Sequence, residues 1–377
     1  MDGLVGSSGF RGIALKEVTP SFCLAMGEAI SSLSPGNHAV GHDVRFSSPL
    51  LAIALALGLN AGGSDVKYIG LAPTPALAFY SRGNSGGAMV TASHNPPEYN
   101  GVKLFDKKGA SISLSKYLKI AAMIPRADAH GNQLLGSIRQ GGGLIDYVEA
   151  VVAAGRSRKG WKVGLDPGNG STTLTAAMIY RAMGIRTKSI NVAPDGSFPG
   201  RGPETNEDAL GGLSDLVRSK SLDIGFAFDG DGDRLAIVDE KGKQIDPDTA
   251  LAFSLARSIK GRKGSVVVNV DTSAIVDYAV EAVGGRVIRS KVGDPYVLEA
   301  MMKHRSMAGG ETCGAWIFPD ISLCPDGVLS SIVFLNLLEE GAMKPSEARA
   351  GLPGLVLRRR KVPCPNKAKR TLVEKLE

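Results

Sequence analysis

Three aspartates lie close together in the sequence FDGDGDR, which spans Phe228 to Arg234. Asp229, Asp231 and Asp233 alternate with glycines, which let the backbone curl tightly enough for all three carboxylates to converge on one point. Hard oxygen ligands in this number suit Mg²⁺, which would keep coordination positions open for phosphate or water. The spacing therefore predicts a magnesium site.

Two other interpretations of this segment are open. It nearly matches a calcium-binding EF-hand loop, with Glu240 at the twelfth position. However, Arg234 stands where that loop needs glycine, and the flanking sequences LDIGFA and LAIVDE are typical of strands, whereas an EF-hand is flanked by helices. A solvated acidic turn is the simplest alternative, but three aspartates between apolar strands are a costly way to make a turn. We expect a metal site between two strands.

A serine follows an apolar stretch in the sequence MVTASHNPPEYNGVK, residues 89–103. Two prolines, which cannot donate to a sheet ladder, come soon after, so Ser93 is expected on a stiff loop at the edge of a sheet. An acyl-transfer serine would need a histidine base. Neighbouring residues on an extended segment point to opposite faces, so His94 is expected to be poorly placed for that role. A phosphorylated Ser93 would instead complete the coordination of a Mg²⁺ held by the three aspartates.

Apolar strand-like runs alternate with helical patterns along the chain, which is typical of α/β domains with parallel or mixed sheets. At Asp43, Asp166 and Asp271 an apolar strand ends in an aspartate and a helix follows, at domain-sized intervals. This weak repeat predicts three α/β domains of similar plan. Turn-forming residues predict linkers near Arg139–Leu144 and near Lys241–Asp248.

Composition narrows the class of protein. The net charge of +7 arises from seven basic residues between Arg358 and Arg370, a stretch without aromatic residues, so no nucleic-acid partner is expected. No apolar run approaches the ~18 residues that a membrane helix needs, and the N-terminal sequence does not resemble a secretory signal. We therefore expect a cytoplasmic protein without a membrane partner. The four scattered cysteines indicate neither a disulfide framework nor a zinc site.

The two loops resemble those of the α-D-phosphohexomutase superfamily, which comprises the phosphomannomutases, phosphoglucomutases and phosphoglucosamine mutases. TASHNPPEYNGVK and DGDGDR carry the resemblance. Further matches follow in the family's order: GSSGFRG, VGHDVRFSS, APTPA, KVGDPYV and GGETCGAWIF. The resemblance covers nearly the whole chain and implies α/β domains around a central cleft.

The expected domains carry one functional loop each, and a fourth domain is expected to be absent or only begun. Their bounds are 1–140 with the phosphoserine loop, 141–242 with the metal loop, 243–350 with the sugar-recognition loop, and 351–377 as a linker and the start of a truncated fourth domain. In the family, the fourth domain grips a substrate phosphate. Its absence predicts weak substrate binding, because several hydrogen bonds would be lost.

The resemblance assigns roles to individual residues. Ser93 would carry the phosphoryl group and, with Asp229, Asp231 and Asp233, bind Mg²⁺. The expected catalytic residues are Ser93, Lys103, Arg11, His94 and Arg234. Cations beside the phosphoserine would stabilise the transferring charge, and Lys103 is also a candidate for proton transfer. Taken without the motifs, Arg11 or Lys103 would be an ordinary surface cation.

Sugar recognition is expected in KVGDPYV and GGETCGAWIF, through Lys291, Asp294, Glu311 and Cys313. A carboxylate such as Glu311 can accept hydrogen bonds from two hydroxyls, although an ordinary loop carboxylate is the alternative. Cys313 stands where serine is frequent in the family, and a thiol is a weak hydrogen-bond partner. Ala315 stands where a histidine is common, and Asp294 where some members carry one.

The resemblance implies an isomerase that interconverts the 6-phosphate and 1-phosphate of mannose or glucose. The reaction would pass through a phosphoserine and a hexose 1,6-bisphosphate, which would also act as activator. A phosphoglucosamine mutase is the alternative in substrate. A phosphosugar-binding relative without turnover and a Mg²⁺-dependent phosphatase are the alternatives in activity. The expected partner is a small phosphosugar, and the expected state is a monomer or homodimer.

Overall fold

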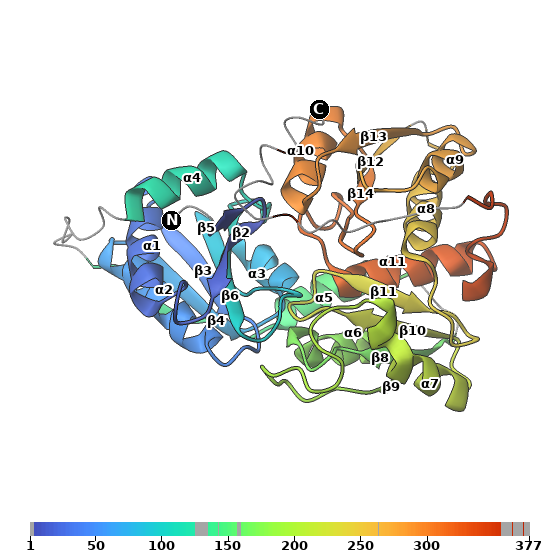
Figure 1. The fold of residues 1–377 in the computed structure, drawn as a ribbon, viewed down its shortest axis with the longest axis horizontal. Helices are drawn as coiled ribbons and strands as arrows, with labels where there is room; N and C mark the ends of the chain where they lie inside the picture. The colour runs from blue at the N-terminus through green and yellow to red at the C-terminus, as the bar shows by residue number, and fades with distance from the viewer. Residues whose placement is uncertain are drawn as a thin grey trace.

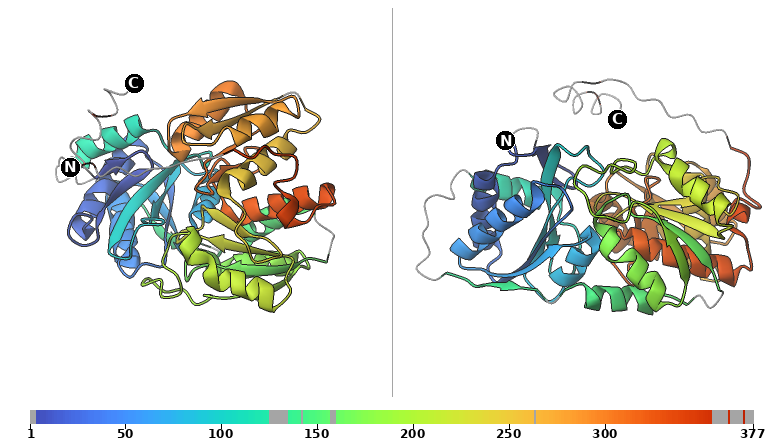
Figure 2. Two further views of the ribbon diagram at one scale, coloured as in Figure 1. Left: turned by 45° about the vertical axis from the view of Figure 1, so that its right-hand side comes forward. Right: turned by 90° about the horizontal axis from the view of Figure 1, so that it is seen from below.

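The structure of the chain, a computed structural model, describes residues 4–124, 135–141, 143–156, 160–262, 264–355, 364 and 372. Three successive regions each contain one sheet that mixes parallel and antiparallel strands, with helices packed against it (Figure 1, Figure 2). We call these regions the first, second and third domains. The predicted fold class is confirmed, whereas the expectation of a truncated fourth domain falls largely on residues outside the described ranges.

The first domain is built on a seven-stranded sheet. Its strands are β1 (Val5–Gly6), β2 (Gly9–Ile13), β3 (Asn37–His42), β4 (Asp65–Leu71), β5 (Gly86–Val90), β6 (Tyr99–Asp106) and β7 (Ile138–Gln140). Its helices are α1 (Pro20–Leu33), α2 (Ser48–Ala61), α3 (Thr74–Ser81) and α4 (Leu114–Met123). The strand order is β1-β2-β6-β5-β3-β4-β7, in which β5, β3, β4 and β7 are parallel. Pro75 lies in the first turn of α3, as predicted.

The order of strands corrects two expectations. Strand β5, which leads to Ser93, lies between β6 and β3 in the middle of the sheet and not at its edge. The loop therefore begins at the carboxyl end of a central strand. The predicted linker at 139–144 is partly wrong, because Arg139 and Gln140 belong to β7, which pairs with β4. Local turn formers do not reveal this pairing, because β7 joins the sheet from a distant part of the chain.

The second domain carries the four-stranded sheet β11-β10-β8-β9. Its elements are β8 (Lys162–Asp166), β9 (Arg186–Ser189), β10 (Ile224–Phe228), β11 (Leu235–Val238), α5 (Ile145–Ala153), α6 (Ala176–Ala182) and α7 (Gly211–Ser219), with 3-10 helices at Ser171–Leu174 and Glu207–Leu210. Strands β10 and β11 form the antiparallel pair that flanks the three aspartates. Because both flanks are strands, the segment is not an EF-hand.

The third domain carries the sheet β13-β12-β14-β15. Its elements are β12 (Ser265–Asn269), β13 (Arg286–Ser290), β14 (Ala308–Gly310), β15 (Trp316–Ile317), α8 (Pro247–Ser258), α9 (Ile275–Glu281), α10 (Asp294–His304) and α11 (Gly327–Glu340), with a 3-10 helix at Pro345–Glu347. Helix α11 lies between the second and third sheets, where it contacts β10 and β11 on one side and α8 on the other (Figure 1).

The pleat of the first sheet divides its core. Val40 and Val90 point toward α1, α2 and α4, whereas Ala39 and Met89 point to the opposite face, where α3 lies. The apolar cluster on that second face continues without interruption into the other two domains. The three domains therefore share one core. Among the described residues, no helix is long and apolar enough to cross a bilayer.

Candidate active site

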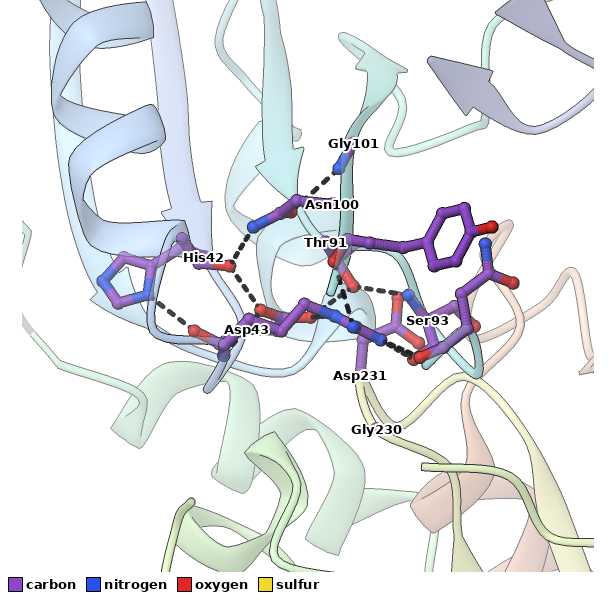
Figure 3. A network of polar contacts seen from close by, with 12 residues as sticks. His42, Asp43, Thr91, Ser93, Asn100, Gly101, Gly230 and Asp231 are labelled. Atoms are coloured by element: carbon purple, nitrogen blue, oxygen red, sulfur yellow. Dashed lines mark hydrogen bonds and ion pairs between the residues drawn. The ribbon is translucent and has the colours of Figure 1, made fainter. Parts of the chain in front are cut away.

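Ser93 lies three residues beyond the end of β5, and only 1% of its surface is exposed. Its backbone φ of +51° is in the left-handed region, which residues other than glycine rarely occupy. Its N–H donates to Thr91 Oγ1 at 2.8 Å, and its Oγ donates to Asp229 Oδ2 at 2.7 Å. Figure 3 shows this loop beside Gly230 and Asp231 of the second domain. The predicted phosphoryl carrier and the predicted metal loop therefore meet.

The position of His94 differs from the prediction. Because the chain at Ser93 is left-handed and not extended, His94 Nδ1 lies 3.4 Å from Ser93 Oγ, on the same side. Burial, together with the positive charges of Arg234 and Arg11, lowers the pKa of His94 to about 3. An imidazole with so low a pKa is a weak base. His94 is therefore a neutral hydrogen-bonding neighbour of the serine hydroxyl.

The metal loop joins β10 to β11. Gly232 has a φ of +80°, and a Cβ there would lie 2.4 Å from Thr172 Cγ2, so this turn requires glycine. Asp229 Oδ1 accepts the N–H groups of Gly232 and Arg234 at 3.0 and 3.1 Å. All three aspartates are buried, and one oxygen of each lies within 4.8 Å of the others. The structure brings the carboxylates together as their spacing predicts.

Lys103, on β6, supplies a positive charge to this cluster. Its Nζ donates to Asp231 Oδ2 at 2.8 Å and to Asp233 Oδ2 at 2.5 Å. Burial by itself lowers the pKa of Lys103, but the two carboxylates outweigh burial and raise it. Lys103 is therefore a cation held between two carboxylates, and its role in proton transfer stays a prediction.

The aspartates carry more negative charge than Lys103 neutralises. Burial, together with the other two carboxylates, raises the pKa of Asp229, and burial and Asp231 raise that of Asp233. Burial opposes ionisation of Asp231 too, but Lys103 lowers its pKa overall. The Oδ1 atoms of Asp231 and Asp233 are buried without a hydrogen-bond partner, which is unfavourable. A small divalent cation that prefers oxygen ligands would satisfy both atoms, so the residues present fit Mg²⁺.

A cleft of about 400 Å³ separates the first and third domains at this point. Arg11, on β2, and Arg234, directly after the metal loop, line it together with Ser93, Lys103 and Asp233. Arg234 Nη1 lies 3.5 Å from Glu204 Oε2, which is also 4.0 Å from His94 Nε2. Positive side chains from two domains thus line the same cavity as Ser93.

The third domain contributes Glu311 and Cys313 to the opposite wall of this cleft. Glu311 follows β14, and its Oε1 accepts Asn269 Nδ2 at 2.7 Å and the N–H of Gly293 at 2.8 Å. Burial raises the pKa of Glu311. Cys313 is exposed to the cleft. Both residues therefore line the same cleft as Ser93.

The other two expected sugar contacts lie differently. Asp294, the first residue of α10, lines the cleft, but its two oxygens accept Ser8 Oγ at 2.8 Å and Ser111 Oγ at 2.9 Å. Both serines belong to the first domain, so Asp294 joins two domains. Lys291 has an exposed side chain and is not among the residues that line the cleft.

Sequence reasoning did not single out three residues that support the site. Thr74 Oγ1 donates to Asp231 Oδ2 at 2.6 Å, Asn269 holds Glu311, and Arg45 binds the backbone of the Ser93 loop. Thr74 lies in APTPA and Arg45 in VGHDVRFSS. These motifs pointed to the right segments, but their contacts are with residues distant in sequence.

Three family models match consecutive parts of the chain. They describe the α/β/α domains of phosphoglucomutase/phosphomannomutase: domain I over residues 2–130, domain II over 145–242 and domain III over 246–354.

Individual relatives agree with these matches. A Methanosarcina acetivorans protein named "Probable phosphoglucosamine mutase" is 38% identical, over 99% of this chain and 86% of its own length. A Thermococcus kodakarensis protein named "Phosphoglucomutase/phosphomannomutase" is 35% identical, over 94% of this chain and 81% of its own. The crystal structure of a phosphoglucomutase/phosphomannomutase family protein from Burkholderia thailandensis superposes with a TM-score of 0.85 at 29% identity, covering 94% of this chain and 80% of that one. The chain therefore belongs to the phosphoglucomutase/phosphomannomutase family of the α-D-phosphohexomutase superfamily.

Proposed function

We propose that the chain is a Mg²⁺-dependent phosphohexomutase in which Ser93 carries the transferred phosphoryl group. The observation that carries this proposal is the 2.7 Å contact between Ser93 Oγ and Asp229, inside a buried cluster of three aspartates. Asp229, Asp231 and Asp233 would hold the Mg²⁺, which would supply positive charge next to the phosphoryl oxygens. Membership of a family of mutases supports the same activity.

The proposed reaction consists of two phosphoryl transfers. In the first, the bond from phosphorus to Ser93 Oγ breaks while a sugar hydroxyl oxygen forms a new bond to phosphorus. The hydroxyl gives up its proton, and Ser93 Oγ takes one up. The product is a hexose 1,6-bisphosphate, which must turn around in the cleft. In the second transfer, Ser93 Oγ gives up its proton and bonds to the phosphorus of the other phosphoryl group, and the sugar oxygen that this group leaves takes up a proton. The net result is an isomerisation.

The side chains of the cleft have separate roles in this scheme. Arg11, Lys103 and Arg234 are cations near Ser93, and preorganised charge of this kind stabilises a transferring phosphoryl group. The neutral His94 lies within 3.4 Å of Ser93 Oγ and would orient it by hydrogen bonding. Glu311 would accept hydrogen bonds from sugar hydroxyls.

Two classes of sugar are supported about equally as substrate. The family resemblance led us to expect mannose and glucose phosphates first, and the Thermococcus relative carries the corresponding name. The Methanosarcina and Pyrococcus abyssi relatives, at 38% and 35% identity, are named as phosphoglucosamine mutases. We therefore propose a hexose phosphate of the glucose or mannose type, with glucosamine phosphate as the second candidate.

The intact mass of the protein before and after incubation with glucose 1,6-bisphosphate and Mg²⁺ tests the phosphoryl-carrier role. We expect a gain of one phosphoryl group, mapped to Ser93 by peptide analysis. Ser93→Ala should gain none, whereas Ser115→Ala, which changes an exposed serine on α4, should gain one as the unaltered protein does. If Ser93 carries no phosphoryl group either as purified or after incubation, the binding relative without turnover becomes the better account.

A comparison of substrates separates the sugar classes. The unaltered protein, primed with bisphosphate, is assayed with mannose 6-phosphate, glucose 6-phosphate and glucosamine 6-phosphate, and kcat/KM is compared. A preference of tenfold or more, about 1.4 kcal/mol, for the amino sugar would favour the second candidate. Release of inorganic phosphate without a sugar 1-phosphate would point to a phosphatase.

A further inference from the structure

The repeated strand-end aspartate has a structural counterpart in the first two domains. Asp43 directly follows β3, and Asp166 is the last residue of β8. Each of these strands runs parallel to the strand that leads into a functional loop: β3 beside β5, which leads to Ser93, and β8 beside β10, which leads to Asp229. Each aspartate also forms a buried ion pair with an arginine, at 3.0 Å for Asp43–Arg45 and 2.8 Å for Asp166–Arg201.

Arg45 holds the Ser93 loop through its backbone. The guanidinium is completely buried, and its five N–H groups all donate. One donates to Asp43, and the other four reach the carbonyl oxygens of Ser93, Asn95, Pro96 and Tyr99 at 2.8, 2.6, 2.6 and 3.0 Å. The guanidinium has five donors in a planar fork, whereas a lysine ammonium has three on one atom and could not satisfy these five acceptors at once.

Asp43 also contacts Ser93 indirectly, through the side chain of Thr91. Its Oδ2 accepts Thr91 Oγ1 at 2.8 Å, and Thr91 Oγ1 accepts the N–H of Ser93 at 2.8 Å (Figure 3). Both the N–H and the carbonyl of Ser93 are therefore fixed by one buried ion pair. A left-handed serine persists only where its surroundings impose that conformation, and it is this conformation that places Oγ against Asp229.

Arg201 acts on the metal loop in the same way. Its Nη2 donates to the carbonyl oxygen of Phe228 at 2.5 Å, and its Nη1 donates to that of Glu204 at 2.7 Å. Phe228 directly precedes Asp229. The side chains of Arg201 and Asp166 are only 4% and 1% exposed. Neither Arg45 nor Arg201 is among the residues that line the cleft.

The third domain uses a variant of this arrangement. Asn269, the last residue of β12, takes the strand-end position, and its side chain binds Glu311 directly at 2.7 Å. Strand β12 is parallel to β14, which leads to Glu311. The predicted third member of the repeat, Asp271, lies two residues beyond the strand, so the repeat is corrected to Asn269 in this domain.

We propose that Asp43–Arg45 and Asp166–Arg201 are paired positioning elements, each of which fixes one functional loop from behind. The first pair orients Ser93 for phosphoryl transfer, and the second orients Asp229 for Mg²⁺. This inference rests on the proposed function for the role of Ser93. Its second half, on metal binding, does not depend on turnover.

Two conservative variants test the pairs separately. In Arg45→Lys, the rate at which saturating glucose 1,6-bisphosphate phosphorylates Ser93 should fall on the order of 10–100-fold, with a half-saturating bisphosphate concentration within about threefold of the unaltered value. In Arg201→Lys, the Mg²⁺ dissociation constant measured by calorimetry without substrate should rise on the order of 10–100-fold, as for other residues that orient metal ligands. At saturating Mg²⁺, Ser93 should be phosphorylated faster in the Arg201→Lys variant than in the Arg45→Lys variant.

Controls distinguish positioning from general loss of stability. Arg218→Lys changes an exposed arginine that pairs with Asp215 and donates to the carbonyl of Gly242, and it should leave both quantities unchanged. If Arg45→Lys does not fold, Thr91→Val and Thr91→Ser test the hydrogen bonds that link Asp43 to the N–H of Ser93. The valine should slow phosphorylation, because it has no acceptor for the Ser93 N–H, and the serine should restore it.

The outcomes separate the inference from the proposed function. If the unaltered protein is not phosphorylated, the proposed function fails, and the Mg²⁺ affinity of Arg201→Lys still decides the inference. The inference is overturned if both lysine variants keep the unaltered phosphorylation rate and Mg²⁺ affinity. It is also overturned if each variant changes both quantities equally in parallel with a lower Tm, because that pattern indicates general destabilisation.

Discussion

At the scale of single residues, the chemistry of the site could be predicted in part from local sequence. Three aspartates separated by glycines converge because the segment that carries them is short, so their spacing alone contains the information. The position of His94 could not be predicted in this way. It depends on the left-handed backbone of Ser93, which is bound by Arg45 from 48 residues earlier in the chain.

The charge balance of the cluster leads to a prediction for Lys103→Gln. Removing one partner of a buried ion pair leaves uncompensated charge, which costs about 3–5 kcal/mol. The variant should therefore have a lower Tm than the unaltered protein in EDTA. Because Mg²⁺ would replace part of the missing positive charge, added MgCl₂ should raise the Tm of the variant more than that of the unaltered protein.

Lys116→Gln serves as the control for this experiment, because Lys116 is an exposed lysine on α4. The Tm of Lys116→Gln in EDTA and its Tm with added MgCl₂ should both equal those of the unaltered protein. An identical Mg²⁺ response in Lys103→Gln and the unaltered protein would show that Lys103 does not balance the metal-binding aspartates. The measurement is thermal unfolding followed by circular dichroism.

At the scale of elements, hydrophobic patterns predicted the existence of strands but not their order. The apolar runs before Ser93 and around the three aspartates are strands, as expected. The central place of β5 results from pairing with β3 and β6, and the addition of β7 results from pairing with β4, whose residues are 72 positions earlier in the chain. Such pairings depend on crossovers and on contacts of whole helices, which a local pattern does not contain.

The start of α11 leads to a pH-dependent prediction. Asp326 caps this helix by accepting the N–H of Leu329 at 2.9 Å and also accepts Tyr147 OH at 2.8 Å. Burial raises the pKa of Asp326 from 3.8 to about 6. As pH rises, the unfolded chain releases this proton first, so Asp326 increasingly destabilises the folded protein from about pH 4 to pH 6 and fully above that.

Asp326→Asn keeps a capping oxygen and removes the charge. Relative to the unaltered protein, its free energy of unfolding should therefore rise between pH 5 and pH 8, by about 1–2 kcal/mol. Denaturant unfolding at the two pH values measures this difference. Asp246→Asn, which changes the exposed cap of α8, is the matched control and should show little dependence on pH. A stability difference for Asp326→Asn that does not vary with pH would contradict the argument.

The end of β12 leads to a prediction about sugar binding. Asn269→Ala removes the amide that holds Glu311, so Glu311 should lose its orientation toward the cleft. The KM for the phosphosugar should rise on the order of 10-fold, with a smaller change in kcat. Thr272→Val, which removes the hydroxyl that donates to Asn269 Oδ1 at 2.7 Å, should show a weaker effect in the same direction. Steady-state kinetics of both variants provide the test, and an unchanged KM in Asn269→Ala would contradict it.

At the scale of the whole molecule, the sequence indicated three domains but not how they are joined. One apolar cluster runs through all three sheets, so the domains are packed directly on one another. The cleft is lined by residues of all three domains. Only the folded molecule shows that Asp294, which the family motif suggested as a sugar contact, joins the first and third domains.

This bridge leads to a prediction about the closure of the cleft. Asp294 accepts Ser8 and Ser111 from the first domain, and hydrogen bonds to a charged group contribute about 1.5–3 kcal/mol each. Asp294→Ala should therefore speed hydrogen exchange on both sides of the bridge, around residues 6–9 and 292–295, and lower kcat/KM on the order of 10-fold. Asp294→Asn keeps one acceptor oxygen. Its exchange rates and its kcat/KM should therefore lie between those of Asp294→Ala and the unaltered protein. Asp277→Ala, which breaks an ion pair with Arg289 inside the third domain, should leave exchange at 6–9 unchanged. If Asp294→Ala lowers kcat/KM without altering exchange in either segment, Asp294 acts on the sugar directly and the original sequence-based expectation is correct.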